Sequence, residues 1–205
     1  MKKNKARKPS QTLRKTPVQS RSADTVAVIV EAAARVLEEQ GIEGFNTNAI
    51  AERAGVSIGS LYQYFRNKDA LLVSLFERQA EPFLHTLEQI PQESSFKEAM
   101  LRVIEASVQQ QLDRPELGRI LDFVERQAAF ESSAKKTSGR ALKVLLKLLR
   151  CPGAPNIQNS QRAALEIVSL IRAMTDTAGE LGETDRAALC TRISGAVDGY
   201  LNTIS

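Results

Sequence analysis

The chain has 205 residues, of which 42% are hydrophobic and 25% charged, with two cysteines and one histidine. This composition is typical of a globular protein and excludes collagen-like, fully disordered and disulfide-dense chains. Charges interrupt the longest apolar runs, so no stretch approaches the ~20 apolar residues that cross a bilayer. Cys151 and Cys190 form no Cys-x-x-Cys pair, so we expect a reduced, cytoplasmic protein. Because His85 is alone, we expect no metal site, no cofactor and no enzymatic activity.

The net charge of +4 combines a basic N-terminus with an acidic remainder. Residues 1–23 carry eight Lys or Arg and no acidic residue, which leaves residues 24–205 with a net charge of −4. No apolar run follows the basic start, so a secretory signal is not expected. Residues 1–22 also lack apolar periodicity, and we interpret them as a disordered basic arm.

Apolar residues recur at helical spacing through the rest of the chain, and no segment alternates apolar and polar residues over the length of a strand. The spacing therefore predicts an all-α fold. Gly41 is expected to stop the first helix, and Pro82 to kink or break the fourth near Glu81. We expect helices at about residues 24–40, 47–54, 58–65, 68–89, 95–112, 115–130, 134–149, 160–179 and 185–202.

Residues 46–65 contain two short predicted helices joined by a tight turn at Gly55-Val56-Ser57. Leu61 and Phe65 lie four residues apart and are expected to anchor the second helix to the core. The remaining side chains of that helix then point outward and offer hydroxyls, an amide and aromatic rings. Such groups can meet base edges and phosphates in a major groove about 12 Å wide. The pattern predicts a helix-turn-helix in which residues 58–65 read DNA.

Two motifs within residues 50–68, IAERAGVS at residues 50–57 and GSLYQYFRNK at residues 59–68, resemble the N-terminal domain of TetR-type transcriptional regulators. The resemblance covers about a quarter of the chain, and the rest agrees only in being helical and of the right length. It implies an N-terminal three-helix DNA-binding domain and a larger helical domain for effector binding and dimerisation. We place the basic arm at residues 1–22, the helix-turn-helix domain at 23–69 and the effector and dimerisation domain at 70–205.

The resemblance also implies which residues touch DNA. Thr47 and Asn48 open the first motif helix, and Lys68 opens the helix after the motif, where it would hold a phosphate. Asn48 has an alternative interpretation as a residue of the first turn beside the cap, and the two tyrosines as ordinary packing residues. The reader helix would contribute Ser57, Ile58, Gly59, Ser60, Tyr62, Gln63 and Tyr64.

The basic arm is expected to add electrostatic attraction, because residues 24–75 have a net charge of −3. Arg14, Lys15 and Arg21 lie nearest the first helix and are the candidates for contact with a phosphate backbone or minor groove. The alternative is that the arm only increases solubility.

Two further sites are expected in the C-terminal two-thirds. In the resembled family, the last two helices of each subunit form a four-helix dimer interface, although an intrachain core could use the same residues. The candidates for this interface are Leu165, Val168, Ile193, Val197, Tyr200 and Leu201. An effector cavity is expected among the helices from about 70 to 175, with Arg172 as the candidate contact because an arginine can fork onto a carboxylate or phosphate. Other polar residues within apolar stretches are His85, Glu105, Gln109, Asp122, Arg126 and Asp176.

The leading hypothesis is a dimeric, sequence-specific transcriptional repressor that a small-molecule effector releases from a palindromic DNA operator. The alternatives are an architectural or non-ligand-responsive DNA-binding protein and an activator of the same family. An enzyme that has kept a helix-turn-helix fold is the third class, but the chain lacks a metal-spaced cluster, a Gly-rich phosphate loop and a Ser-His-Asp arrangement.

Overall fold

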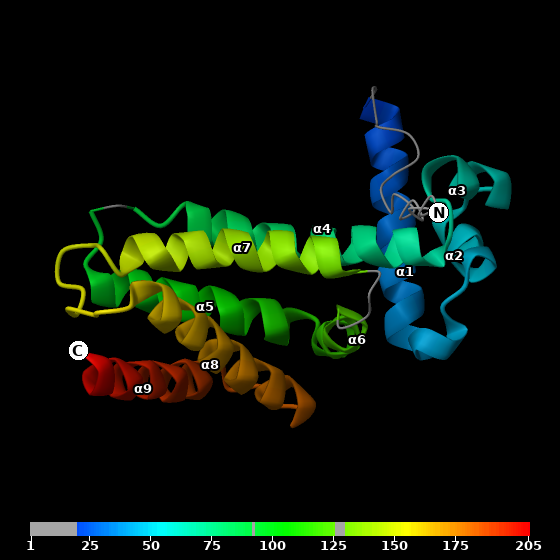
Figure 1. Ribbon diagram of the computed structural model, residues 1–205. Helices are drawn as coiled ribbons and strands as arrows, with labels where there is room; N and C mark the ends of the chain where they lie inside the picture. Colours follow the sequence, from blue (N-terminus) through cyan, green and yellow to red (C-terminus); the bar gives the residue numbers. More distant parts are fainter. Residues whose placement is uncertain (1–19, 92, 126–129) are drawn as a thin grey trace, which may run out of the picture. The chain divides into compact units, whose positions relative to one another are not determined.

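The computed structural model describes residues 20–91, 93–125 and 130–205, and over these residues it contains nine helices and no strand (Figure 1). The expected all-α fold is therefore confirmed. The helices are α1 (Ser20–Gly44), α2 (Thr47–Ala54), α3 (Ile58–Tyr64), α4 (Lys68–Glu88), α5 (Phe96–Asp113), α6 (Pro115–Glu125), α7 (Glu131–Leu148), α8 (Ser160–Glu180) and α9 (Arg186–Ile204).

Three details differ from the sequence-based expectation. Helix α1 begins at Ser20 rather than near residue 24, so the last three residues assigned to the arm are helical. Regular geometry in α1 is interrupted at Gly41, whose φ of 65° is a left-handed value that suits glycine, and the helix resumes to Gly44. Helix α4 continues through Pro82 to Glu88, so the predicted break does not occur.

The contacts divide the chain into two compact units that meet between Leu75 and Phe76, within α4. In unit 1, α2 packs against α1 and α3 against α2. Its core includes Ile29, Leu37, Ile50, Leu61 and Phe65, all of which are fully buried. The two motif helices are thus fixed to α1 by apolar packing.

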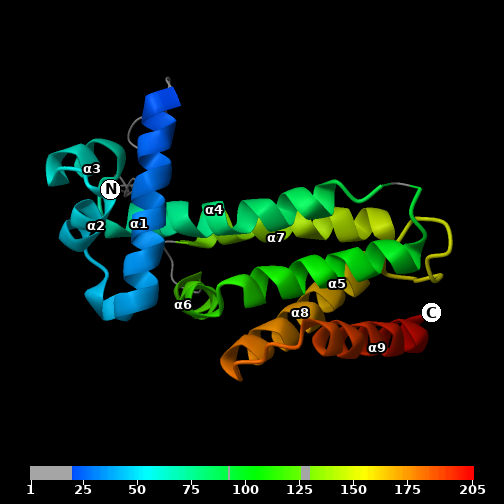
Figure 2. The ribbon, with the colours of Figure 1, turned by 180° about the vertical axis from the view of Figure 1, so that it is seen from behind.

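Unit 2 is a helical bundle built around α5, which contacts α6, α7, α8 and α9. Helix α9 also packs on α8, and both α6 and α7 contact α8. Figures 1 and 2 show α7 running beside the second half of α4, where Arg140 forms ion pairs with Glu81 at 2.7 Å and Glu88 at 2.8 Å. The core of this bundle includes Ile104, Leu145, Ile167, Leu189 and Ile193. No helix among the described residues is long and apolar enough to cross a membrane.

Candidate nucleic-acid interface and internal cavity

Hydrogen bonds from side-chain caps define both motif helices. The Asn46 side-chain oxygen accepts a bond from the backbone N–H of Ala49 at 2.9 Å, and Ser57 Oγ accepts one from Ser60 N–H at 3.0 Å. Between the helices, Gly55 adopts a φ of 66° and its N–H bonds to carbonyls of α2. These caps and the left-handed turn fix where α2 ends and α3 begins.

Helix α3 has a buried side and an exposed side. Leu61 and the following Phe65 are fully buried, as their four-residue spacing predicts. Ile58 and Tyr62 also lie four residues apart, but they are 39% and 41% exposed. Gln63 and Gly59 are exposed as well. Large apolar and amphipathic side chains on an open face of a short capped helix suit contact with a partner surface.

Hydroxyl groups link the predicted DNA-contacting residues to one another. Thr47 and Tyr62 share a hydrogen bond of 3.2 Å between their hydroxyl oxygens, which brings the start of α2 and the exposed side of α3 together. Ser57 and Ser60 share another of 2.8 Å. Asn48, at the start of α2, is exposed.

Tyr64 differs from Tyr62. It is partly buried, and its hydroxyl oxygen accepts a hydrogen bond from Ser22 of α1 at 3.4 Å. Tyr64 therefore contributes to the contact between α3 and α1.

Two further contacts frame this surface. Arg53 donates two hydrogen bonds to Glu39, at 2.5 and 2.6 Å, and so ties α2 to α1 in a bidentate pair that the sequence did not indicate. The side-chain oxygen of Asn67 accepts the N–H of Ala70 at 2.9 Å and caps α4. Lys68, the first residue of α4, is exposed. Arg14 and Lys15 lie outside the described residues, and so does the side chain of Arg21.

The last two helices do not present all of the predicted dimer residues. Ile193, Val197 and Leu201 are at most 4% exposed because they pack into the core of their own chain. Their side chains are not available to a partner, and this part of the expectation is corrected. Tyr200 is partly buried and donates a hydrogen bond to Glu166 of α8. Only Leu165 is half exposed, at 50%, and Val168 instead lines a cavity.

Unit 2 contains a partly open cavity of about 180 Å³, lined by residues of α4, α5, α6, α7 and α8. Most of its wall is apolar, and the polar part includes a charged group, three glutamines and several hydroxyl side chains. The apolar residues include Phe76, Phe83, Leu87, Val103, Leu145, Val168 and Ile171, and the polar ones include Gln110, Gln111, Asp122, Glu125, Arg172 and Asp176.

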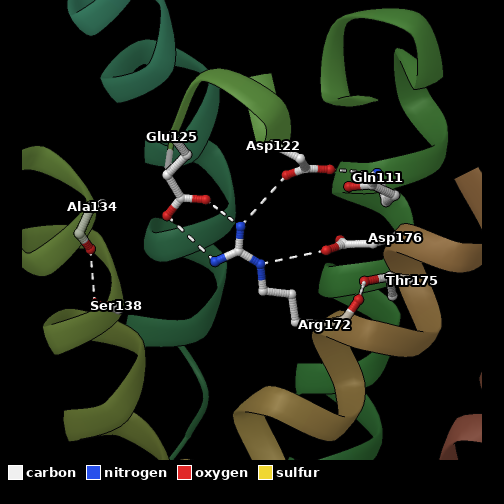
Figure 3. Close-up of polar contacts among 8 residues, drawn as sticks. All are labelled: Gln111, Asp122, Glu125, Ala134, Ser138, Arg172, Thr175 and Asp176. Atoms are coloured by element: carbon white, nitrogen blue, oxygen red, sulfur yellow. Dashed lines mark hydrogen bonds and ion pairs between the residues drawn. The ribbon is translucent and has the colours of Figure 1, made fainter. Parts of the chain in front are cut away.

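Arg172 of α8 lies at the centre of the charged group and is surrounded by carboxylates (Figure 3). Its guanidinium donates to Glu125 of α6, and ion pairs of 3.7 and 3.5 Å join it to Asp122 and Asp176. These contacts occupy the fork that was expected to bind an anionic effector. We call Asp122, Glu125, Arg172 and Asp176 the charged cluster.

The surroundings of the charged cluster raise the pKa of the Asp176 carboxyl to about 6, chiefly through burial and then through the nearby charge of Asp122. Gln111 is buried and donates to Asp122 at 3.1 Å. A Cβ at Gly179 would lie only 3.0 Å from the Gln111 side-chain nitrogen, so glycine makes room for this amide.

Several polar residues considered from the sequence do not line the cavity. His85, Glu105 and Gln109 are exposed and absent from its wall, and Arg126 lies outside the described residues. Glu125 and the three glutamines of the wall, Gln79, Gln110 and Gln111, were missed. Their helical positions carry no motif, and only the packing of five helices brings them to one place.

Comparison with known proteins shows what the N-terminal unit is similar to. Residues 29–75 match the family model described as bacterial regulatory proteins, tetR family. The chain is 36% identical over 77 residues to the fatty acid metabolism regulator protein of Bacillus subtilis (strain 168). The matched segment covers 37% of this chain and 40% of that protein. The chain is 43% identical over 60 residues to the class A tetracycline repressor protein from transposon 1721 of Escherichia coli, covering 29% and 28% of the two chains. The matched segments thus span less than half of these relatives.

The whole fold also has solved counterparts. The transcriptional regulator FadR from Bacillus subtilis, in complex with stearoyl-CoA, superposes with a TM-score of 0.73 at 22% identity, over 83% of this chain and 96% of that one. At this identity the likeness shows the fold alone. The two proteins matched by sequence and this solved structure are regulators. Over residues 29–75, the chain is thus similar to bacterial regulatory proteins of the tetR family.

Proposed function

We propose that this protein is a sequence-specific DNA-binding transcriptional regulator that works as a homodimer. The observation that carries the proposal is the exposed side of α3, where Ile58, Tyr62 and Gln63 stand open on a helix whose other side is fully buried. This arrangement suits a reader helix in the major groove. The proposed DNA contacts remain Thr47, Asn48, Ser57, Ile58, Gly59, Ser60, Tyr62, Gln63, Tyr64 and Lys68, with Arg14, Lys15 and Arg21 from the N-terminus.

The proposal of a dimer rests on α8 and α9. One reader helix covers only a few base pairs, so a second copy is needed for high specificity. Leu165 is a half-exposed large apolar side chain on α8. On α9, Cβ atoms at Gly195 and Gly199 would meet no other atom within 4 Å, so this face is open to close approach by another helix. The corrected interface thus uses the outer faces of α8 and α9 and leaves the core residues out.

We further propose repression relieved by a small molecule. The cavity in unit 2 supports an effector site, since mostly apolar cavities with a few polar groups are typical of ligand sites. Two similar proteins, a tetracycline repressor and a FadR in complex with stearoyl-CoA, support both repression and ligand response. An effector would act by favouring a conformation that binds the operator less well.

Selection of bound sequences from random DNA duplexes with the purified protein tests the proposal. A palindromic consensus with two half-sites about 34–36 Å apart is expected for a two-fold dimer. Enrichment without a consensus would instead favour an architectural DNA-binding protein. Leu165→Glu should shift the protein toward monomer in sedimentation, and Glu105→Gln, an exposed change on α5, is the matched control.

A further inference from the structure

We propose that the ligand of the cavity in unit 2 is a hydrophobic organic cation, such as a protonated amine with an alkyl or aryl body. This inference rests on the proposed function only in taking the cavity as the effector site. The chemistry of the wall itself supplies the class of ligand.

The charge of the wall is the first argument. Among the described residues that line the cavity, three carboxylates, Asp122, Glu125 and Asp176, accompany one cation, Arg172. With all four groups ionised, the charged cluster has a net charge of −2. The side chain of Glu125 is only 14% exposed, that of Asp176 25% and that of Asp122 29%, so water screens them less than a surface group. A ligand cation would relieve this excess, whereas a carboxylate or phosphate would add to it.

The state of Arg172 is the second argument. An anionic ligand would need its guanidinium, but three carboxylates of the chain surround that group (Figure 3). To bind an anion, Arg172 would have to leave Glu125 and Asp176, and two partly buried carboxylates would lose their counter-ion. The arrangement therefore disfavours an acyl-CoA, whose phosphates are anionic.

The position of the charged cluster is the third argument. Glu125, Arg172 and Asp176 line the cavity and also a neighbouring, more open hollow beside Ala134 and Ala173. The cluster thus lies between the apolar interior and this opening. A ligand with a cationic head and an apolar body would place its head at the cluster and its body against side chains such as Phe83 and Leu145.

One uncharged group fits the same ligand class. Gln110 lines the cavity, and its side-chain oxygen is buried with no hydrogen-bond partner among the residues that the structure describes. A buried acceptor without a donor is unfavourable. The N–H groups of a protonated amine are donors only, and so suit a wall rich in acceptors.

Calorimetric titration of the full chain with three ten-carbon compounds tests this inference. Decylammonium, decanol and decanoate share an apolar body but differ in the charge of the head, and the amine is protonated at pH 7.5 as a lysine is. We expect decylammonium to bind at least about tenfold more tightly than the other two. Tighter binding of decanoate or stearoyl-CoA than of decylammonium, lost in Arg172→Gln, would overturn the proposal.

Variants show whether the carboxylates are responsible. Glu125→Gln and Asp176→Asn should each weaken decylammonium binding about tenfold and leave decanol binding unchanged. Glu105→Gln removes an exposed carboxylate that does not line the cavity, and should change neither. Equal binding of decylammonium by all of these proteins would contradict the inference.

DNA selection and decylammonium binding, measured on the same purified protein, test the proposed function and this inference separately. If the protein selects a DNA consensus but shows no preference for decylammonium, the inference fails and the regulator remains. If decylammonium binds as expected but the protein selects no consensus, the ligand class stands and the proposed function fails.

Discussion

The two units of this protein place polar chemistry in opposite ways. In unit 1, α3 turns Tyr62 and Gln63 outward, and its exposed side chains carry no charge. In unit 2, the charged cluster is drawn partly inside, where Glu125 is only 14% exposed. A surface that must distinguish one DNA sequence from many can use uncharged hydrogen-bonding groups. A partly buried site can select its ligand by charge, because water screens charges weakly there. The variants below test whether that division is real.

The largest expected effect is on folding and comes from the buried side of α3. Leu61 is fully buried, and Leu61→Ala should lower the free energy of unfolding by about 2–5 kcal/mol through lost burial and a cavity. Thermal unfolding followed by circular dichroism measures the change. A loss below ~1 kcal/mol would mean that α3 is not anchored as described.

The next residue on the same helix should behave in the opposite way. Tyr62→Ala should leave the unfolding temperature nearly unchanged, because the side chain is 41% exposed. It should weaken binding to the selected operator by about 1–3 kcal/mol at each half-site, as measured by fluorescence anisotropy. Tyr62→Phe is the matched control, since it keeps the ring but removes the hydrogen bond to Thr47. If Tyr62→Ala binds the operator like the unchanged protein, α3 does not read DNA through this side.

In unit 2, the ionised carboxylate of Asp176 should lower the free energy of unfolding, because it is partly buried at the proposed ligand site. Its pKa of about 6 in the folded state lies above the ordinary value of 3.8, so folding stability from this group is present at low pH and falls as pH rises through 6. Asp176→Asn should therefore raise the free energy of unfolding at pH 7.5, by about 1–3 kcal/mol, but not at pH 4. Urea unfolding at both pH values measures this.

The same ionisation should govern the proposed ligand. Below pH 6 the charged cluster loses one negative charge, so decylammonium should bind more weakly at pH 5 than at pH 7.5. Asp176→Asn should remove most of that pH dependence. A pH dependence retained in the variant would place the titrating group elsewhere.

The smallest effect concerns the N-terminus, where long-range attraction is expected to add to recognition by unit 1. Deleting residues 1–19 leaves α1 intact and should weaken operator binding. It should also reduce the slope of log affinity against log salt by roughly 1–2, as expected for the loss of Arg14 and Lys15 from phosphates. An unchanged slope would show that the basic residues do not touch DNA.

The sequence predicts the helix-turn-helix of unit 1 better than the charged cluster of unit 2. The helix-turn-helix is contiguous, so residues 46–68 alone carried its turn glycine, its buried spacing at Leu61 and Phe65, and the family resemblance. The charged cluster comes from α6 and α8, nearly fifty residues apart in the chain, and no local pattern links Glu125 to Arg172. The apolar stripe of α9 was visible, but whether Ile193 and Val197 face their own core or a partner depends on how α5 and α8 pack, which a stripe does not encode.

The most direct test of the central claim is the affinity of the purified protein for its selected duplex and for a scrambled duplex of the same length and composition at 0.15 M salt. We predict that the selected duplex binds at least about 10³-fold more tightly, which is the ratio typical of specific recognition. Equal affinities for the two duplexes would contradict the account, because the exposed side of α3 would then carry no sequence recognition.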